Sequence, residues 1–310
     1  MRQDLIPDYV ASALQLSMLL ELSGHPKPGN IDRQHDFNTT RYEHFLSSIA
    51  CLGRSWRRAA LDGYAFPAST PRTGLTIYDA SNDMMRWQTD GNTSFGSILL
   101  LIPLATAAGA MFRKSEFEEP VLRRFLRDII DSTTVEDALY LYKAIEVARP
   151  GGLGNVPSLD ATDKKSYDAI QNSQVTLKEV FRLSSRYDSI SREWSTGFEI
   201  TFELGCPYFR RMIEQTNDVN VAVVHTFLRI LSETPDTLIA RRCGQEKAAE
   251  ISKRAHGVLK AGGLLSGRGR ASIARFDKKL RTKGHLLNPG ATADLACSSV
   301  AVAVLGGFRP

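Results

Sequence analysis

The segment from Phe95 to Phe112 constrains the fold of this chain more than any other. Its 18 residues carry no charge, which is the lower end of the length that a helix needs to cross a bilayer. It is therefore either a transmembrane helix or a helix buried inside a folded domain. Small and hydroxyl-bearing residues fill roughly half of this segment, and Pro103 lies inside it. No Trp or Tyr flanks it, as is common at the ends of a transmembrane helix, and no second comparable span is evident. We expect a buried core helix and no membrane insertion.

Helical periodicity covers most of the remaining chain. Apolar residues recur at steps of three and four, the pattern of a helix with one buried face. Strand signals are limited to a brief alternation at Thr76–Tyr78 and to β-branched and aromatic residues at Phe198–Phe202. Because there is no strand–helix alternation, repeat or flexible tether, we predict an all-α fold with a single large domain over residues 1–310. The predicted further helices cover residues 8–22, 41–61, 118–130, 134–148, 177–204, 219–232, 235–261 and 292–305.

Composition places the chain among ordinary globular proteins. Hydrophobic residues make up 43% and charged residues 24% of its 310 residues, which excludes a disordered or collagen-like chain. The four cysteines are scattered without a C-x-x-C pair, so a disulfide framework is not expected. The first residues, Met1-Arg2-Gln3-Asp4, include an acid where a signal peptide would carry basic residues. Together these features favour a reducing cytoplasm.

Positive charge is concentrated in one stretch, Ser252–Lys283. It holds ten Lys and Arg against one acid, or +9, whereas the whole chain carries +5 and the rest therefore −4. Such a stretch indicates a partner that carries several phosphates. Nucleic acid is not expected as that partner, because Phe276 is the only aromatic residue interleaved with these charges.

The first candidate site is the turn that follows the first helix. Two prolines and a glycine around Lys27 fix the backbone, and a rigidly held ammonium group suits phosphate. Asp32, Arg33 and Asp36 follow closely and mix metal-type with anion-type ligands. An ordinary polar turn would show the same residues.

Two further polar turns precede apolar helices. Asn92, Thr93 and Gly96 open the uncharged helix, and the stretch Asn288–Asp294, with Thr292 inside it, opens the C-terminal helix. The first-turn amides and positive dipole end of a helix attract anions, and Gly96 would allow close approach. The alternative for either turn is a simple N-cap.

Two carboxylates lie on or beside apolar helix faces. Glu21 continues the apolar stripe of the first helix, and Glu193 borders a stripe that includes Trp194. A buried carboxylate is costly unless it is paired or used in chemistry. The alternatives are a frayed last turn that leaves Glu21 in water and a boundary salt bridge for Glu193.

Several standard motifs are absent from the sequence. There is no Walker A loop, no complete G-x-G-x-x-G after a strand and no G-x-S-x-G elbow. The six histidines show no familiar metal-ligand spacing. A serine hydrolase, a dehydrogenase and a P-loop kinase therefore lose support.

Taken together, the motifs resemble those of the triphosphoribosyl-dephospho-CoA synthase family. The resemblance rests on Glu21 with Pro26-Lys27-Pro28-Gly29-Asn30-x-Asp32-Arg33, on Gly91-Asn92-Thr93-x-x-Gly96 and on Asn288-Pro289-Gly290-x-Thr292-Ala293-Asp294-Leu295, and it covers about residues 10–305. It implies an all-α enzyme that moves the triphosphoribosyl group of ATP onto 3′-dephospho-CoA and releases adenine. ATP and Mg²⁺ would be required, the substrates would be small molecules, and a homodimer stays open.

The resemblance also implies roles for these residues. Glu21, Asp32 and Glu193 would act in catalysis, and Asp36 and Asp294 would hold the metal ion. The remaining residues would bind the nucleotide: Lys27, Arg33, Asn92, Thr93, Gly96, Asn288 and Thr292.

One departure from the family pattern keeps other functions open. Ser94-Phe95 stands where bacterial members have His-Lys, and Pro150–Gly154 and Asp218–Thr226 look closer to an archaeal and methylotroph branch. A related ATP-dependent ribosyl or nucleotide transfer in another cofactor pathway, such as C1-carrier biosynthesis, is therefore one alternative. A non-catalytic nucleotide-sensing or RNA-binding protein is another.

Overall fold

Helices form nearly all of the regular structure in this computed structural model, which describes residues 2–151, 165–281 and 284–310. Within that part the only β-type pairing is an isolated bridge between Asp32 and His35. The all-α prediction is confirmed. The helices are α1 (Ile6–Ser23), α2 (Tyr42–Ala65), α3 (Thr73–Arg86), α4 (Phe95–Lys114), α5 (Glu119–Asp131), α6 (Val135–Ala148), α7 (Lys165–Asn172), α8 (Leu177–Ser184), α9 (Ser189–Thr196), α10 (Cys206–Thr216), α11 (Val219–Glu233), α12 (Thr237–Cys243), α13 (Gln245–Lys260), α14 (Gly267–Leu280) and α15 (Gly290–Leu305), with short 3₁₀ or π segments η1 (Gln3–Leu5), η2 (Ile200–Gly205) and η3 (Gly263–Leu265).

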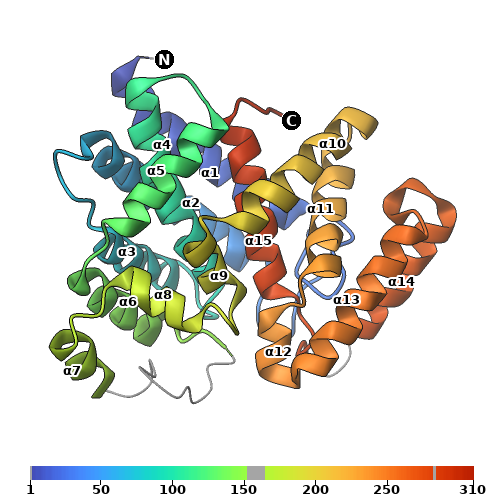
Figure 1. The fold of residues 1–310 in the computed structure, drawn as a ribbon. Coiled ribbons are helices and arrows are strands. Elements are labelled where there is room, and N and C mark those ends of the chain that lie inside the picture. Colours follow the sequence, from blue (N-terminus) through green and yellow to red (C-terminus); the bar gives the residue numbers. More distant parts are fainter. Residues whose placement is uncertain (1, 152–164, 282–283) are drawn as a thin grey trace.

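The uncharged segment forms a core helix, as predicted. Helix α4 packs against α1, α2, α5 and α15 (Figure 1), and nearly all of its side chains up to Met111 are buried. Pro103 does not interrupt it. A proline has no N–H to donate to the carbonyl four residues earlier, and here the Leu99 carbonyl instead accepts a hydrogen bond from the Trp194 indole at 3.0 Å.

A second helix also has the length and hydropathy of a membrane span. It runs over Gln3–Ser23, and the expectation of no second comparable span is therefore wrong. Of its most apolar window, 56% is buried inside the protein, against 89% for α4. Packing within the fold buries the apolar residues of α4, whereas it buries only about half of the apolar window of the N-terminal helix.

Helices α2 and α4 approach each other closely through two glycines. A Cβ atom on Gly63 would lie 1.8 Å from the Thr106 carbonyl oxygen, and one on Gly109 would lie 2.0 Å from that of Ala60. No side chain fits at either position, so the two backbones rest directly on each other.

Gly109→Ala should therefore lower the free energy of unfolding by about 1–3 kcal/mol, because the added methyl group overpacks the contact. Urea denaturation measures this change. Gly257→Ala on α13 is the matched control, since nothing lies within 4 Å of its Cβ position. That control should be neutral or stabilising by up to about 1 kcal/mol. If Gly109→Ala and Gly257→Ala change the free energy of unfolding equally, the close contact between α2 and α4 is contradicted.

Several predicted boundaries were wrong for identifiable reasons. The predicted helix 177–204 is split into α8, α9 and η2, because Asp188 caps a new helix start and Gly197, at φ 65°, ends α9. Thr76–Tyr78 lies within α3 and not in a strand, and α3 is missing from the predicted helices. Helix α14 is missing from them as well.

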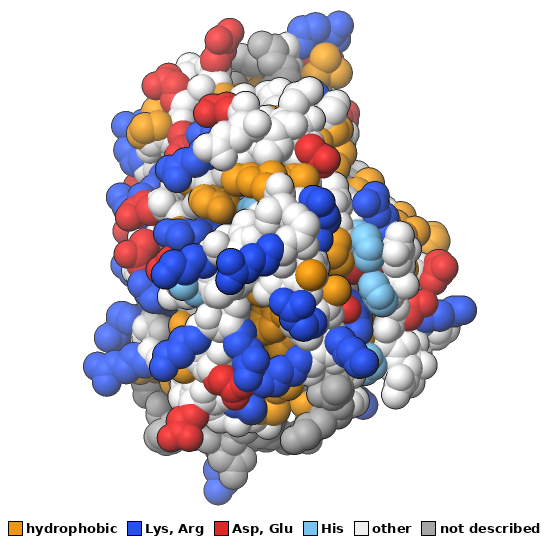
Figure 2. Space-filling view, turned by 90° about the vertical axis from the view of Figure 1, so that its right-hand side faces the viewer, with side chains coloured by type: hydrophobic (Ala, Val, Ile, Leu, Met, Phe, Trp, Pro, Cys, Tyr) orange, Lys and Arg blue, Asp and Glu red, His pale blue; other side chains and the backbone are white. Residues whose placement is uncertain are grey.

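The basic stretch lies mostly on α13 and α14, which form an antiparallel pair at one edge of the molecule (Figure 1). Lys and Arg side chains gather in the middle and lower part of that face (Figure 2). Part of this charge is neutralised locally, because Glu250 pairs with Lys247, Arg254 and Lys279. Lys283 lies outside the described residues.

Candidate active site

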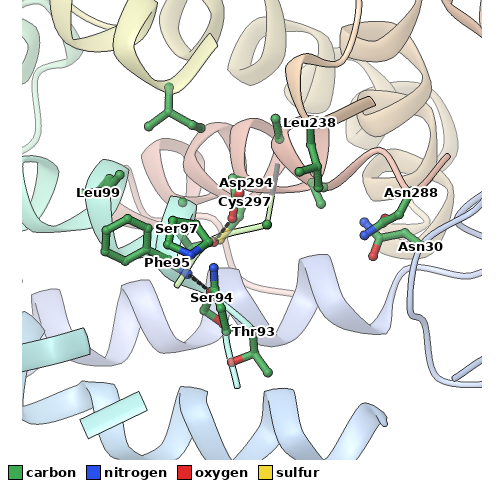
Figure 3. Close-up of a pocket in the computed structure, with 18 of the residues that line it drawn as sticks. Asn30, Thr93, Ser94, Phe95, Ser97, Leu99, Leu238, Asn288, Asp294 and Cys297 are labelled. Carbon is green, nitrogen blue, oxygen red and sulfur yellow. Dashed lines mark hydrogen bonds between the residues drawn. The ribbon is translucent and has the colours of Figure 1, made fainter. Parts of the chain in front are cut away.

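The three polar turns converge on one cavity of about 980 Å³. Its wall includes Lys27 after α1, Asn92 before α4 and Asp294 in the first turn of α15. Figure 3 shows Asp294 and Cys297 of α15 directed toward Ser97 at the start of α4, with Asn30 and Asn288 facing each other farther along the wall. The convergence expected from the sequence is thus present. The predicted site residues that line the cavity are Glu21, Lys27, Asn92, Thr93, Gly96, Asn288 and Asp294.

Glu21 and Lys27 form a buried ion pair in the cavity wall. The Lys27 Nζ atom lies 2.5 Å from Glu21 Oε1 and 2.9 Å from the Glu21 carbonyl oxygen, and the lysine side chain is only 1% exposed. Burial raises the pKa of Glu21, while the Lys27 ammonium opposes that rise. Glu21 is therefore paired and not frayed into water. Phosphate binding by Lys27 is not supported, because its ammonium group is already bonded to Glu21.

Asp294 meets the start of α4 at close range. Ser97 donates a hydrogen bond to Asp294 Oδ1 at 2.6 Å, and a Cβ on Gly96 would lie 2.1 Å from Oδ2. Glycine is required at position 96 for this carboxyl group to fit. Burial, with the charges of Glu21 and Asp236 as smaller causes, raises the pKa of Asp294 to about 7. A carboxyl group that is partly protonated near neutral pH can act as a general acid.

The loop that presents Lys27 is held from behind by helix α14. Gly29 has φ 74° and packs against Leu280, so glycine is required there. The Gly29 N–H donates to Asp277 at 2.8 Å, and the Arg281 guanidinium donates to the Asn30 carbonyl at 2.7 Å. The end of the basic stretch therefore supports the cavity wall, although none of its described Lys or Arg residues lines the cavity.

The two remaining turns line the cavity at the starts of α4 and α15, whose N-cap residues, Ser94 and Pro289, make no side-chain cap hydrogen bond. Asn92 is not the N-cap residue of α4, but its Oδ1 atom accepts the Phe95 N–H at 3.0 Å, and Thr93 bonds Ser48 at 2.6 Å. Asn288 differs, since its Oδ1 atom is buried without a hydrogen-bond partner. An unpartnered buried acceptor costs free energy, so Asn288 is suited to receive a donor from a ligand.

Five predicted site residues do not line the cavity. Arg33 and Asp36 are exposed, and Asp36 accepts the Tyr42 N–H at the start of α2. Asp32 is buried behind the Lys27 loop. The geometry does not support the direct roles predicted for these three residues.

Glu193 and Thr292 are committed to internal hydrogen bonds. The Glu193 carboxylate accepts the N–H groups of Ile200 and Thr201 at 2.8 and 2.9 Å, which fixes the junction of α9 with η2. Burial raises the pKa of Glu193 to about 7. Thr292 donates its hydroxyl to Asp236, which also caps α12. We therefore leave both residues out of the proposed site, and Glu193 makes neither the boundary salt bridge nor a cavity contact.

The sequence reasoning missed three arginines in the cavity wall: Arg149 after α6, and Arg241 and Arg242 at the end of α12. Arg241 pairs with Asp188, and the Arg242 guanidinium lies against Gly151. Burial and the charge of Arg241 lower the pKa of Arg242, so an anion bound between them would be stabilised. The adjacent residues Arg241 and Arg242 could have indicated an anion site, but the sequence prediction placed them inside one continuous helix.

The predicted metal ligands do not come together. Asp36 is on the surface, whereas Asp294 is in the cavity and bonded to Ser97. The other lining carboxylates are also engaged: Glu21 by Lys27, Asp90 by Thr40 and Asp188 by Arg241. The residues that line the cavity therefore do not fit a resident Mg²⁺ ion held by Asp36 and Asp294.

Comparison with known proteins shows the family of this chain. Residues 7–309 match the model of the ATP:dephospho-CoA triphosphoribosyl transferase family. The chain belongs to this family. It is a transferase by family membership, and the resemblance seen in the three turns is confirmed.

Individual relatives are distant, and the share of the chain that they cover varies. The 2-(5″-triphosphoribosyl)-3′-dephosphocoenzyme-A synthase of Klebsiella pneumoniae is 25% identical over 301 residues, 92% of this chain and 87% of that protein. That of Escherichia fergusonii is 29% identical over 103 residues, 33% of each chain. A crystal structure from Archaeoglobus fulgidus, provisionally assigned as a triphosphoribosyl-dephospho-CoA synthase, superimposes with a TM-score of 0.64 at 25% identity, covering 85% of this chain and 100% of that one.

Proposed function

We propose that this transferase moves the triphosphoribosyl group of ATP onto 3′-dephospho-CoA and releases adenine. In this reaction the bond between the ribose C1′ and adenine N9 breaks, and a hydroxyl oxygen of the acceptor ribose bonds to C1′. Adenine gains a proton and the acceptor hydroxyl loses one. The observation that carries the proposal is the pair of carboxyl groups, Glu21 and Asp294, in one cavity with three arginines.

The two carboxyl groups are suited to opposite tasks because their surroundings differ. Asp294 has no paired cation and a pKa raised to about 7, so it donates the proton that adenine needs as it leaves. Burial raises the pKa of Glu21 as well, but the paired Lys27 ammonium opposes that rise and stabilises the carboxylate. As a carboxylate it stabilises positive charge at C1′ and takes the proton of the attacking hydroxyl.

The arginines are suited to the triphosphate. Arg149, Arg241 and Arg242 offer a polyanion charge-assisted hydrogen bonds from planar, bidentate donors. Since the lining carboxylates do not form a resident Mg²⁺ site, Mg²⁺ enters this proposal only as the counter-ion that the triphosphate brings with it.

Adenine release tests the reaction directly. Purified protein is incubated with ATP and Mg²⁺, with and without dephospho-CoA, and adenine and the coupled product are measured by chromatography and mass. Adenine that depends on dephospho-CoA supports the proposal. Adenine that appears only with another phosphorylated acceptor would move the enzyme to a different cofactor pathway, which the Ser94-Phe95 departure keeps open. ATP binding without adenine would favour nucleotide sensing.

Arg242→Ala should lower kcat/KM for ATP by about 10- to 100-fold, the value of one charge-assisted hydrogen bond of about 1.5–3 kcal/mol. Steady-state kinetics with varied ATP measures the effect. Arg275→Ala on α14 is the control, because that residue is exposed and lies outside the cavity wall. An unchanged kcat/KM for Arg242→Ala would remove this residue from the phosphate subsite.

A further inference from the structure

The loop after α1 brings two imidazoles onto one buried carboxylate outside the cavity wall. His25 Nδ1 lies 3.1 Å from Asp32 Oδ2, and His35 Nδ1 lies 3.0 Å from Asp32 Oδ1. These three donor atoms all lie within 4.8 Å of one another, and among the described residues they form the one group of at least three His, Cys, Asp or Glu side chains that meets this limit. We propose that His25, Asp32 and His35 bind a divalent transition-metal ion, with Zn²⁺ as the test ion.

The orientation of His25 distinguishes this group from a chain of hydrogen bonds. Its Nδ1 atom is buried and makes no hydrogen bond, although Asp32 Oδ2 is only 3.1 Å away. In a hydrogen bond the N–H points at the oxygen, whereas two ligands of one ion direct their lone pairs at a third point. Ligands held at about 2.0–2.1 Å from one Zn²⁺ ion lie about 3–3.5 Å apart. The two His–Asp pairs have this spacing, and the two imidazole nitrogens lie within 4.8 Å of each other.

The backbone holds all three ligands in place before any ion binds. Asn220 of α11 accepts the His25 N–H at 2.8 Å and donates to the His25 carbonyl at 2.7 Å. Asp32 and His35 exchange two backbone hydrogen bonds of 3.2 Å. The His35 side chain is 37% exposed and that of His25 is 19% exposed, so water can enter and complete the coordination.

The charges around the group are compatible with a cation. The N–H groups of Lys27 and Gln34 donate to the Asp32 carboxylate at 3.1 and 2.9 Å, and hydrogen bonds of this kind favour the charged form of a carboxyl group. Arg281 is the nearest cation, at 3.9 Å from Asp32 Oδ2, and both oxygens of Asp277 accept from it at 2.9 Å. Asp32 therefore offers an anionic carboxylate as the third ligand.

The donor set indicates the class of ion. Two imidazole nitrogens and one carboxylate suit Zn²⁺, Ni²⁺ or Co²⁺, whereas Mg²⁺ prefers oxygen ligands. Because Asp32 also accepts the Lys27 N–H at 3.1 Å, an ion bound here would stiffen the loop that carries Lys27 and Asn30 into the cavity wall. The role is structural and does not depend on the proposed reaction.

Titration with Zn²⁺ tests the site in a Cys51→Ser/Cys243→Ser background, which removes the two incompletely buried thiols. After chelator dialysis, calorimetry should show one saturable site that excess Mg²⁺ does not displace, and Zn²⁺ should raise Tm. His35→Gln in the same background should weaken binding at least 10-fold and abolish the Tm rise. His256→Gln is the control, since His256 is exposed on α13.

X-ray absorption of the Zn²⁺-loaded parent protein gives a readout that does not depend on how well a variant folds. It should show two imidazole nitrogens bound to the ion. The proposal is overturned if the parent shows no saturable Zn²⁺ binding, if His35→Gln binds as tightly as the parent, or if the absorption spectrum lacks imidazole ligands.

Discussion

Asp294→Asn should abolish adenine release and at the same time raise the unfolding temperature at pH 8. The amide cannot donate an acidic proton to adenine, but it keeps the size of the side chain and an oxygen that accepts from Ser97. The aspartate must ionise in an enclosed site beside Glu21, whereas the amide does not ionise. Activity and stability should thus change in opposite directions, as is common where a functional group is held in an unfavourable environment.

The size and pH range of the stability gain follow from linkage. The folded-state pKa of Asp294 is raised from 3.8 to about 7, so its contribution to stability is fully present below pH 3.8 and is lost as the pH rises to about 7. At pH 8 this loss amounts to roughly 2–4 kcal/mol, with the lower value allowing for water in the cavity. The gain in stability of Asp294→Asn over the wild type should therefore increase from pH 5 to pH 8.

Thermal unfolding at both pH values and adenine release at neutral pH measure the two effects. Asp36→Asn is the matched control, because this exposed carboxylate lies outside the cavity. It should keep both activity and stability. Full activity of Asp294→Asn would remove Asp294 as the acid, and a stability difference that does not vary with pH would show that its pKa is not raised.

Lys27→Met should destabilise the fold by about 3–5 kcal/mol, because it leaves the buried Glu21 carboxylate without its cation. Adding Glu21→Gln should recover part of that loss, since the double variant has no unpaired charge. Both variants should lose turnover. Urea unfolding of the wild type, the two single variants and the double variant measures the coupling between the two residues.

Lys278→Met on α14 is the control for this cycle, because it replaces an exposed lysine outside the cavity. It should change stability by less than about 0.5 kcal/mol. If Lys27→Met is as stable as the wild type, or if the two single effects simply add, Lys27 and Glu21 do not form the buried pair that the structure shows.

The helical fold was predictable because it depends on local sequence patterns. Apolar spacing along α1, α5 and α6 and the uncharged run in α4 place those helices to within a few residues. The prediction of one continuous helix from 177 to 204 was wrong. The apolar stripe continues through the break at Gly197, so the pattern gave no sign that the helix ends there. Periodicity reports which face is buried and does not report where the chain turns.

The site was predictable in part for a similar reason. Lys27, Asn92 and Asp294 lie in turns whose composition marks them as unusual, and they meet in the cavity. Asp32 and Glu193 have the same side-chain chemistry but bond backbone N–H groups within the fold. No local signal separates a carboxylate that faces a cavity from one that supports a loop.

The sequence by itself determined the helical class, the buried position of α4 and the three turns that carry chemistry, since each follows from residues close together in the chain. Only the tertiary structure decided that Glu21 pairs with Lys27, that Gly96 admits Asp294 and that three arginines complete the cavity. Glu21 and Lys27 are close in the chain, but the contact of Gly96 with Asp294 and the cavity itself join positions about 200 residues apart or more. Their geometry is set by how whole helices pack, which no short stretch of sequence encodes.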